Sequence, residues 1–277
     1  MKMMNTASPK DLILNILSAS EGRPLQTREA VDACALFGLR ASSVRVALAR
    51  LCGAGVIEAI GRGAYQLGPT TAGLVRELGS WKSMEQRLKE WTGAWVMVCS
   101  GMLGRVDRPA LTRRQRALSL LGFKELDRDI YVRPDNLVGG VEAIRERLRR
   151  LGLEQEAFVL LAFDLGTERD AQARALWDGQ TLNASYRQTR DRLEHSLAKM
   201  DELEPEEAAR ESFLLGEAAI RQMIYDPLLP APLIDEAERR ACLAVVRQYD
   251  LIGHNIWLQI SGARFGENKP SFSVALN

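Results

Sequence analysis

The sequence predicts an α+β protein made of three consecutive domains, over residues 1–78, 79–165 and 166–277. In the first domain short helices precede a two-stranded hairpin, in the second strands and helices alternate, and the third is mostly helical. Each prediction rests on apolar residues that recur every three to four positions in a helix and every two in a strand. With 46% hydrophobic and 26% charged residues, the chain has the composition of a globular protein rather than of a disordered one.

Three helices are predicted at the start of the first domain. A Ser-Pro pair begins the apolar pattern over residues 8–20, which is typical of a helix start. Two more helices follow over residues 27–37 and 42–52, each with a glycine directly after it. Serine and threonine side chains often cap such helices, because their oxygens accept hydrogen bonds from the first free amides. The expected N-caps are Thr27 for the second helix and Ser42 or Ser43 for the third.

A hairpin is predicted after these helices. Val56–Ile60 and Tyr65–Leu67 are short apolar strands, and Gly61-Arg62-Gly63 joins them as a turn. A further helix over residues 71–78 closes the domain. Three helices followed by a hairpin with a basic tip is the arrangement of a winged helix-turn-helix, which is a DNA-binding domain.

Candidate DNA contacts lie on the third helix and at the hairpin tip. A helix that enters the major groove needs small or polar residues at its start, with cations beside them for the phosphates. The first two domains each carry a net charge of +3 and the third carries −5, so a polyanion favours the first two. A solvated helix face is the alternative for the same residues. The predicted DNA-binding residues are Arg40, Ser42, Ser43, Arg45, Arg50 and Arg62.

The second domain is predicted to be a ferredoxin-like α/β sandwich, because strands and helices alternate within a short stretch. Residues 80–95, which contain three tryptophans, are expected to be a linker into the first strand. The strands are expected at 94–99, 129–133 and 158–163, with one more near Lys124, and the helices at 112–121 and 137–151.

The third domain is predicted to be helical. Asp235 and Glu238 resemble a capping box for its last helix. Before that helix, three prolines over residues 226–232 predict an extended and rigid loop. The expected helices are 182–200, 204–225 and 235–250, and a loose tail is expected from 261 onward.

Four segments carry a further signal through their order and spacing. They are residues 39–67, Trp91-Thr-Gly-Ala-Trp95, the run Arg113–Phe123 with Tyr131-Val-Arg-Pro134 after it, and Asp226-Pro-Leu-Leu-Pro230. Together they resemble the PaaX family of bacterial transcriptional repressors, named for a regulator of phenylacetate catabolism. The chain departs from the family pattern where Leu233 stands in place of a Trp-Pro-Gly step, and residues 251–277 match nothing in it.

This resemblance implies a cytoplasmic homodimer that represses a catabolic operon, binds double-stranded operator DNA and is released by an aryl-acyl-CoA effector. Such a thioester needs cations for its phosphates and an apolar slot for its acyl group. Solvated arginines and helix-packing aromatic residues are the alternative, and no cofactor, metal or catalytic residue is expected. The predicted effector-binding residues are Arg113, Arg114, Arg116, Tyr186, Arg190, Arg221 and Tyr225.

Two other functions stay open on sequence alone. One is a nucleic-acid-processing enzyme, because the second domain resembles small CRISPR-associated endonucleases that hold a metal on an aspartate after the first strand. Here that strand ends in Val98-Cys99-Ser100, and the next carboxylate is Asp107. The other is a scaffold whose winged helix binds protein. Four cysteines without a CxxC pair and two histidines predict neither a zinc site nor disulfides, and no membrane helix or signal peptide is expected.

Overall fold

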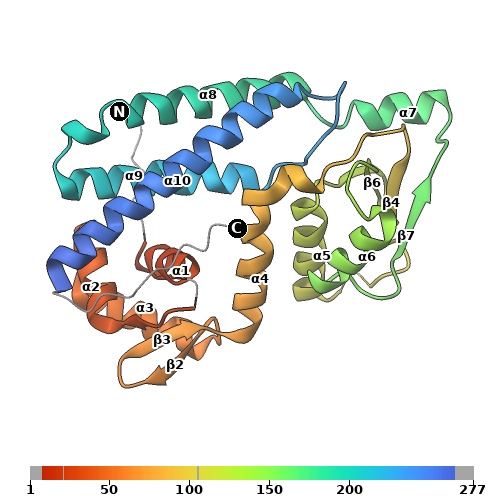
Figure 1. The fold of residues 1–277 in the computed structure, drawn as a ribbon. Helices are drawn as coiled ribbons and strands as arrows, with labels where there is room; N and C mark the ends of the chain where they lie inside the picture. Colours follow the sequence, from red (N-terminus) through yellow and green to blue (C-terminus); the bar gives the residue numbers. More distant parts are fainter. Residues whose placement is uncertain (1–7, 21, 105, 266–277) are drawn as a thin grey trace. The chain divides into compact units, whose positions relative to one another are not determined.

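The computed structural model describes residues 8–20, 22–104 and 106–265 (Figure 1). It contains both helices and sheets, which confirms the predicted α+β class as far as the mixture of helix and sheet is concerned. The chain forms two compact units. The amino-terminal unit combines Met1–Val75 with His195–Glu217 and Gln248–Asn277, and the central unit combines Arg76–Glu194 with Ala218–Arg247. The division into three consecutive domains stays a prediction.

Parts of the C-terminal helices complete the amino-terminal unit, whose first segment contains three helices and a small sheet. Their order along the chain agrees with the helix and hairpin predictions, and the sheet has the antiparallel order β1-β3-β2. The elements are α1 (Pro9–Ala19), β1 (Leu25–Gln26), α2 (Thr27–Ala35), α3 (Ala41–Gly53), β2 (Ile57–Gly61) and β3 (Ala64–Leu67), and α4 (Pro69–Gly79) follows them.

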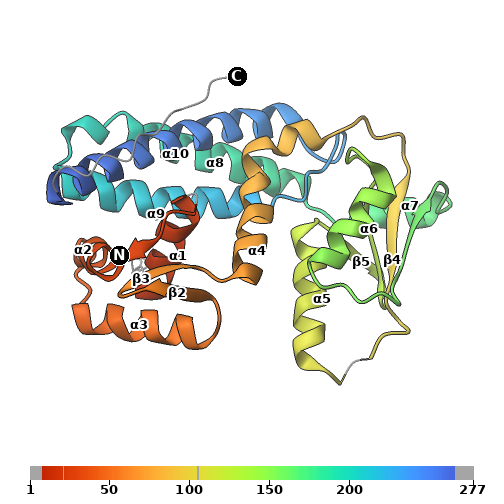
Figure 2. The ribbon, with the colours of Figure 1, turned by 60° about the horizontal axis from the view of Figure 1, so that its bottom comes forward.

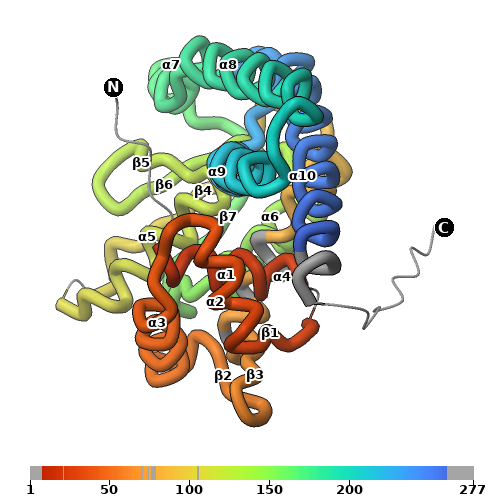
Figure 3. Tube along the Cα trace, turned by 90° about the vertical axis from the view of Figure 1, so that its left-hand side faces the viewer, coloured from red at the N-terminus to blue at the C-terminus, as the bar shows by residue number. Residues whose placement is uncertain are grey.

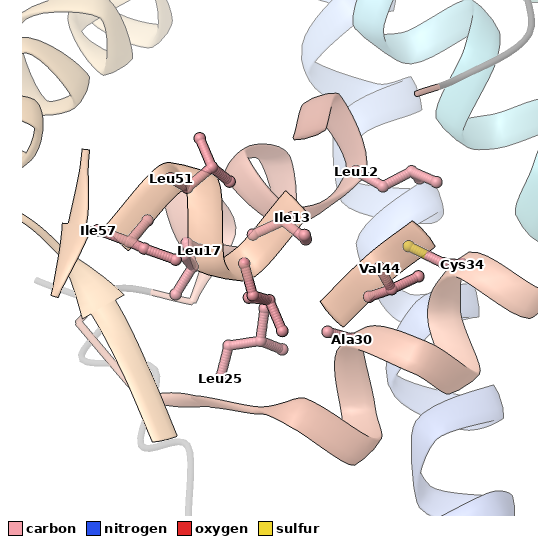
Figure 4. Packing of buried hydrophobic residues seen from close by; sticks show 10 residues of the cluster. Leu12, Ile13, Leu17, Leu25, Ala30, Cys34, Val44, Leu51 and Ile57 are labelled. Atoms are coloured by element: carbon pink, nitrogen blue, oxygen red, sulfur yellow. The ribbon is translucent and has the colours of Figure 1, made fainter. Parts of the chain in front are cut away.

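One apolar core holds these helices together (Figure 4). Leu12 and Ile13 of α1 and Val44 of α3 are completely buried in it. Burying a side chain of this size stabilises the folded state by about 1.5–3 kcal/mol. The core therefore fixes which face of α3 points inward. The remaining members of the core are Leu17, Leu25, Ala30, Cys34, Leu48, Leu51 and Ile57.

Both predicted N-caps in this unit are wrong. Gln26 is the N-cap of α2, and its amide donates to the Glu29 carboxylate at 2.9 Å. Arg40 is the N-cap of α3, so Ser42 and Ser43 lie in the first turn of that helix. The physical reason is that the backbone already turns at Gly38, where φ is +70°, which lets α3 begin before the serines.

The central unit contains a four-stranded sheet of order β5-β6-β4-β7, in which every neighbouring pair is antiparallel. Helices α5 and α6 lie along the same face of this sheet (Figure 2). The predicted extra strand near Lys124 is present as β5. The elements are β4 (Trp95–Cys99), α5 (Arg108–Leu120), β5 (Lys124–Asp127), β6 (Ile130–Pro134), α6 (Gly140–Arg150) and β7 (Phe158–Ala162).

Residues 80–95 are not the linker that we expected. The first part forms the 3-10 helix η1 (Ser80–Arg87), in which Trp81 is buried. Trp95 is buried as well, and its Nε1 donates to Asp170 at 2.8 Å. Trp91 packs edge-on against Trp95, with 5.2 Å between ring centroids. Large aromatic side chains are therefore packing residues of the central unit rather than parts of a spacer.

The remaining helices are α7 (Thr167–Arg174), α8 (Gly179–Leu197), η2 (Met200–Glu202), α9 (Pro205–Ile224) and α10 (Glu236–Phe265). Helix α10 continues past the expected end at Asp250 and replaces the first residues of the expected loose tail. In the amino-terminal unit it packs against α9 (Figure 3), where a Cβ at Gly253 would lie 3.3 Å from the Ser212 Cβ. Gly253 thus marks a close contact between α9 and α10. Residues 266–277 of the expected tail lie outside the described residues.

The expected capping box of α10 is half correct. Asp235 caps the helix, since its Oδ1 accepts from the amide of Ala237 at 2.8 Å. The side chain of Glu238 instead accepts from Arg190 Nη1 at 3.0 Å. No helix among the described residues is both long enough and apolar enough to cross a membrane.

Candidate nucleic-acid interface

Helix α3 has one buried face and one exposed face. Val44, Leu48 and Leu51 point into the core, with exposed fractions of 0–5%. Figure 2 shows α3 on the outside of the amino-terminal unit. The exposed residues recur at the spacing of one continuous helix surface. This surface, called the α3 outer face below, consists of Ser42, Ser43, Arg45, Val46, Ala49 and Arg50.

The α3 outer face is cationic and its charges are not neutralised locally. Helix α3 contains no acidic residue. Among the described residues, no ion pair engages Arg45, Arg50, the N-cap residue Arg40 or Arg62 of the hairpin turn. All four side chains are exposed. Uncompensated cations on an outer surface of this kind attract phosphates.

Arg62 is held at the hairpin tip by contacts from α2. The backbone amide and the hydroxyl of Thr27 both donate to the carbonyl of Gly63, at 2.8 and 3.0 Å. Gly63 has φ of +70°, and a Cβ there would lie 3.2 Å from the Thr27 Oγ1. Thr27, expected as a helix cap, therefore fixes the turn that presents Arg62.

Val46 is a residue of this surface that sequence reasoning missed. Its side chain is 50% exposed, between Arg45 and Arg50 on the outer face. An apolar side chain at such a place can contact the methyl group of thymine in the major groove. The signal was available, because Val46 stands three residues after Ser43 and four before Arg50.

The turn that precedes α3 is held by the C-terminal helices of the same unit. Arg210 of α9 donates from Nη1 to the carbonyl of Leu36 at 3.2 Å. The ring of Phe37 packs edge-on against Phe213 of α9 at 5.2 Å and stacks on Trp257 of α10 at 6.3 Å. The position of α3 thus depends on residues more than 170 positions away, which no local pattern reveals.

The three arginines expected to form a basic cluster on α5 are not equivalent. Arg113 and Arg116 are exposed, whereas Arg114 is buried. Arg114 donates from Nε to Glu154 Oε2 at 3.1 Å and from Nη2 to the carbonyl of Gly104 at 3.2 Å. This ion pair raises the pKa of Arg114 and lowers the pKa of Glu154. Arg114 is therefore engaged within the fold.

The other predicted effector residues are also spread between engaged and exposed positions. Arg190 pairs with Glu238 at 3.0 Å and with Asp191 at 3.5 Å. Arg221 and Tyr225 are exposed at the end of α9, where Tyr225 keeps 42% of its surface. None of these three side chains lines the pocket that Trp81, Arg133 and Asp226 line, and neither do Arg113 and Arg116.

Tyr186 is buried and is bonded to the loop Asp226–Pro230, called the DPLLP loop below. Its hydroxyl donates to Asp226 Oδ2 at 2.6 Å, and the amide of Leu228 donates to Asp226 Oδ1 at 2.7 Å. Burial raises the pKa of both Tyr186 and Asp226. Tyr186 thus shapes the loop with a neutral hydroxyl.

The DPLLP loop also docks on the four-stranded domain. Asn136 donates from Nδ2 to the carbonyl of Leu228 at 2.7 Å. Gly122, with φ of +73°, lies so close that a Cβ would stand 2.7 Å from the Pro227 Cα. Leu228 itself has φ of +53°, so the loop is not uniformly extended as predicted. The DPLLP loop therefore packs against the four-stranded sheet domain within the central unit.

Metal chemistry has a weak basis in the described residues, where no three His, Cys, Asp or Glu side chains gather as ligands. Strand β4 ends at the half-buried Cys99, and the buried Ser100 follows it where a carboxylate would be needed.

Comparison with known proteins gives one family match. Residues 177–259 match the model of the PaaX-like protein C-terminal domain. A search of the curated proteins finds no match. Among solved structures, the uncharacterized protein Rv0674 from Mycobacterium tuberculosis has a TM-score of 0.59 and 22% sequence identity, over 91% of this chain and 98% of that chain. At this identity the likeness shows the fold alone.

Proposed function

We propose that this chain, a PaaX-like protein by its C-terminal domain, is a transcriptional repressor that binds operator DNA through α3 and the β2–β3 hairpin. The family match supports a regulator rather than an enzyme. The observation that carries the proposal is the α3 outer face, whose exposed cations no ion pair engages among the described residues. Arg62 at the hairpin tip extends the same charge to a second element.

The arrangement of α1–α3 and the β2–β3 hairpin supports a winged helix-turn-helix. In that domain α3 is the recognition helix and the hairpin is the wing. Ser42, Ser43 and Val46 would lie nearest the bases, with Arg40, Arg45 and Arg50 on bases or phosphates beside them. The strand order β5-β6-β4-β7, with both helices on one face, supports the ferredoxin-like assignment of the middle domain.

The remaining features of the proposal are a homodimer, a cytoplasmic location and an aryl-acyl-CoA effector. One winged helix reads few base pairs, so specificity commonly comes from two copies on a two-fold-symmetric site. An effector releases DNA only if it binds more tightly to the state with low DNA affinity. Of the predicted effector residues, Arg113, Arg116, Arg221 and Tyr225 are the exposed ones and are the first to test.

The decisive experiment is a gel-shift titration with the intergenic DNA upstream of the gene, at physiological salt. We expect a specific complex on an imperfect inverted repeat, which unlabelled specific DNA displaces and random DNA does not. A protein-binding scaffold would give no specific complex. Light scattering with and without DNA tests the dimer, and a mass of one chain, 30.8 kDa, in both cases would contradict it.

A second titration tests the effector class on the preformed complex. Release by the CoA thioester but not by its free acid supports the acyl-CoA effector. Release by the free acid alone, or by neither compound, contradicts it.

A further inference from the structure

Exposed apolar side chains of the amino-terminal unit lie on the two elements that carry the candidate DNA contacts. Over residues 8–20 and 22–69, the large hydrophobic side chains that remain exposed are Val46 of α3 and Ile60 of β2, at 50% and 47%. Exposed arginines stand within two residues of both. Covering an apolar side chain removes its surface from water and is favourable. A polyanion that the arginines attract would at the same time cover both apolar side chains.

Val46 points away from the core of the unit. It stands two residues after Val44 and two before Leu48, which are both buried. Two residues turn a helical side chain by about 200°, so Val46 lies about 160° from each of them. Ser42 and Ala49 share this outward side and are exposed too, since they stand four residues before and three after Val46. The middle of the α3 outer face is therefore an uncharged stripe of Ser42, Val46 and Ala49.

Arg45 and Arg50 lie on opposite sides of this stripe. By the turn of the helix, Arg45 stands about 100° from Val46 in one direction and Arg50 about 40° in the other. Both side chains are exposed. When a helix enters a major groove, its flanks approach the two phosphate backbones and its middle approaches the base edges. With α3 in the groove, Val46 is therefore the large apolar side chain that comes closest to the bases.

An apolar side chain can distinguish the bases by one chemical feature of the major groove. Guanine, cytosine and adenine present hydrogen-bond donors and acceptors there, whereas thymine also presents a C5-methyl group. Valine has no side-chain donor or acceptor, so at a polar base edge Val46 would displace water without replacing its hydrogen bonds. Beside a methyl group, two apolar surfaces leave water together. The chemistry of Val46 therefore favours thymine.

We propose that Val46 contacts the C5-methyl group of one thymine in each half of the operator and thereby determines sequence specificity at that position. The inference rests on the proposed function and adds a base preference to it. Electrostatic attraction by the exposed arginines acts on DNA of any sequence. The contact of Val46 with a methyl group stabilises the complex at one base pair, which makes Val46 a specificity-determining residue.

Deoxyuridine in place of single thymines tests the contact, because deoxyuridine pairs as thymine does and lacks only the C5-methyl group. Each thymine of the operator is replaced in turn, and the affinity of the full chain is measured by fluorescence anisotropy at physiological salt. We expect one position in each half-site, related by the two-fold symmetry, at which the affinity falls about three- to fivefold. This is the factor that corresponds to losing the burial of one methyl-sized group.

The variant Val46→Ala assigns the methyl contact to this side chain. Alanine has a higher helix propensity than valine, and Val46 is outside the core, so α3 should stay folded and the circular dichroism spectrum should stay that of the parent chain. We expect Val46→Ala to bind the thymine operator about as weakly as the wild type binds the deoxyuridine operator, and to bind both operators alike. Leu251→Ala is the matched control, because it shortens a 61% exposed apolar side chain on α10; it should keep the wild-type difference between the operators.

The possible results separate this inference from the proposed function. A specific complex that no deoxyuridine weakens refutes the methyl contact and leaves the proposed function standing. A loss that persists unchanged in Val46→Ala assigns the methyl group to another side chain and also refutes the inference. If the unmodified operator forms no specific complex with the wild-type chain, the proposed function fails, and the role of Val46 fails with it.

Discussion

Arginine has opposite roles in the two units of this protein. On the α3 outer face and the hairpin tip, Arg40, Arg45, Arg50 and Arg62 are exposed. In the central unit, Arg114, Arg133 and Arg239 are buried and donate to backbone carbonyls or to Glu154. An exposed guanidinium keeps its donors for a ligand, whereas a buried one is part of the packing. Arginine clusters in a sequence therefore indicate binding only after burial is known.

The largest effect expected from this contrast is on stability. Arg133→Met removes the buried side-chain donor to two backbone carbonyl oxygens and to Asn136 Oδ1. Each buried unsatisfied group costs about 1–3 kcal/mol, so we expect a loss of about 3–5 kcal/mol in the free energy of unfolding. Urea unfolding followed by tryptophan fluorescence measures it. Arg150→Met should change the value by less than about 0.5 kcal/mol, as an exposed site does.

The exposed arginines should act on DNA affinity and leave stability unchanged. We expect Arg45→Ala/Arg62→Ala to reduce operator affinity by about 2–4 kcal/mol, because a base-reading arginine contributes about 1–3 kcal/mol and a phosphate contact adds to it. Fluorescence anisotropy at several salt concentrations measures both the affinity and the salt slope. Arg28→Ala is the control, since Arg28 pairs with Asp32 on α2. Wild-type affinity in the double variant would remove α3 and the wing from the interface.

Substitution of Tyr186 distinguishes a structural role of its contact with the DPLLP loop from a role in ligand binding. Tyr186→Phe removes the donor to Asp226 and leaves that buried carboxylate with one neutral partner fewer. We expect a loss of about 1–3 kcal/mol in the free energy of unfolding. Calorimetric melting measures it. If Tyr186→Phe kept full stability but lost effector response, the phenol would belong to a ligand site instead.

The pH dependence of stability should report on Asp226. Burial raises its pKa in the folded state above the ordinary value of 3.8, so the folded state holds this proton more tightly than the unfolded state. The stabilisation that comes from this bound proton is fully present below pH 3.8 and is lost as the pH rises through the folded-state pKa of Asp226. Asp226→Asn should therefore gain stability relative to the wild type as the pH rises through this range. Parallel stability curves for the two proteins would contradict the assignment.

The smallest effect is expected at the turn before α3. Arg210→Ala removes a single hydrogen bond from a half-buried side chain to the Leu36 carbonyl, so we expect a loss of about 0.5–1 kcal/mol in stability. Hydrogen exchange of the Phe37 and Gly38 amides measures the local effect. Protection equal to that of the wild type would mean that the packing of Phe37 on Phe213 holds the turn alone.

Local patterns predicted most helices and strands of this chain. The periodic apolar residues of α1 and α3 and the glycines of the hairpin turn act within about ten residues, which is why they can be read directly. The N-caps were less predictable, because Thr27 and Ser42 have the right side chains but the backbone turn at Gly38 sets where α3 begins. The extension of α10 past Asp250 was less predictable as well, because Ser212, against which Gly253 packs, lies far away in the sequence.

By itself, the sequence determined the exposed charge of the candidate DNA interface. Helix periodicity places Val44 and Leu48 inward, so Arg45 and Arg50 must face outward whatever surrounds them. Only the tertiary structure decided whether the other arginines and Tyr186 are buried or exposed. Whether Arg133 and Arg114 are buried depends on strands, helices and loops that meet from distant parts of the chain. Burial of a side chain depends on all the segments that pack around it, and a local sequence pattern does not contain those segments.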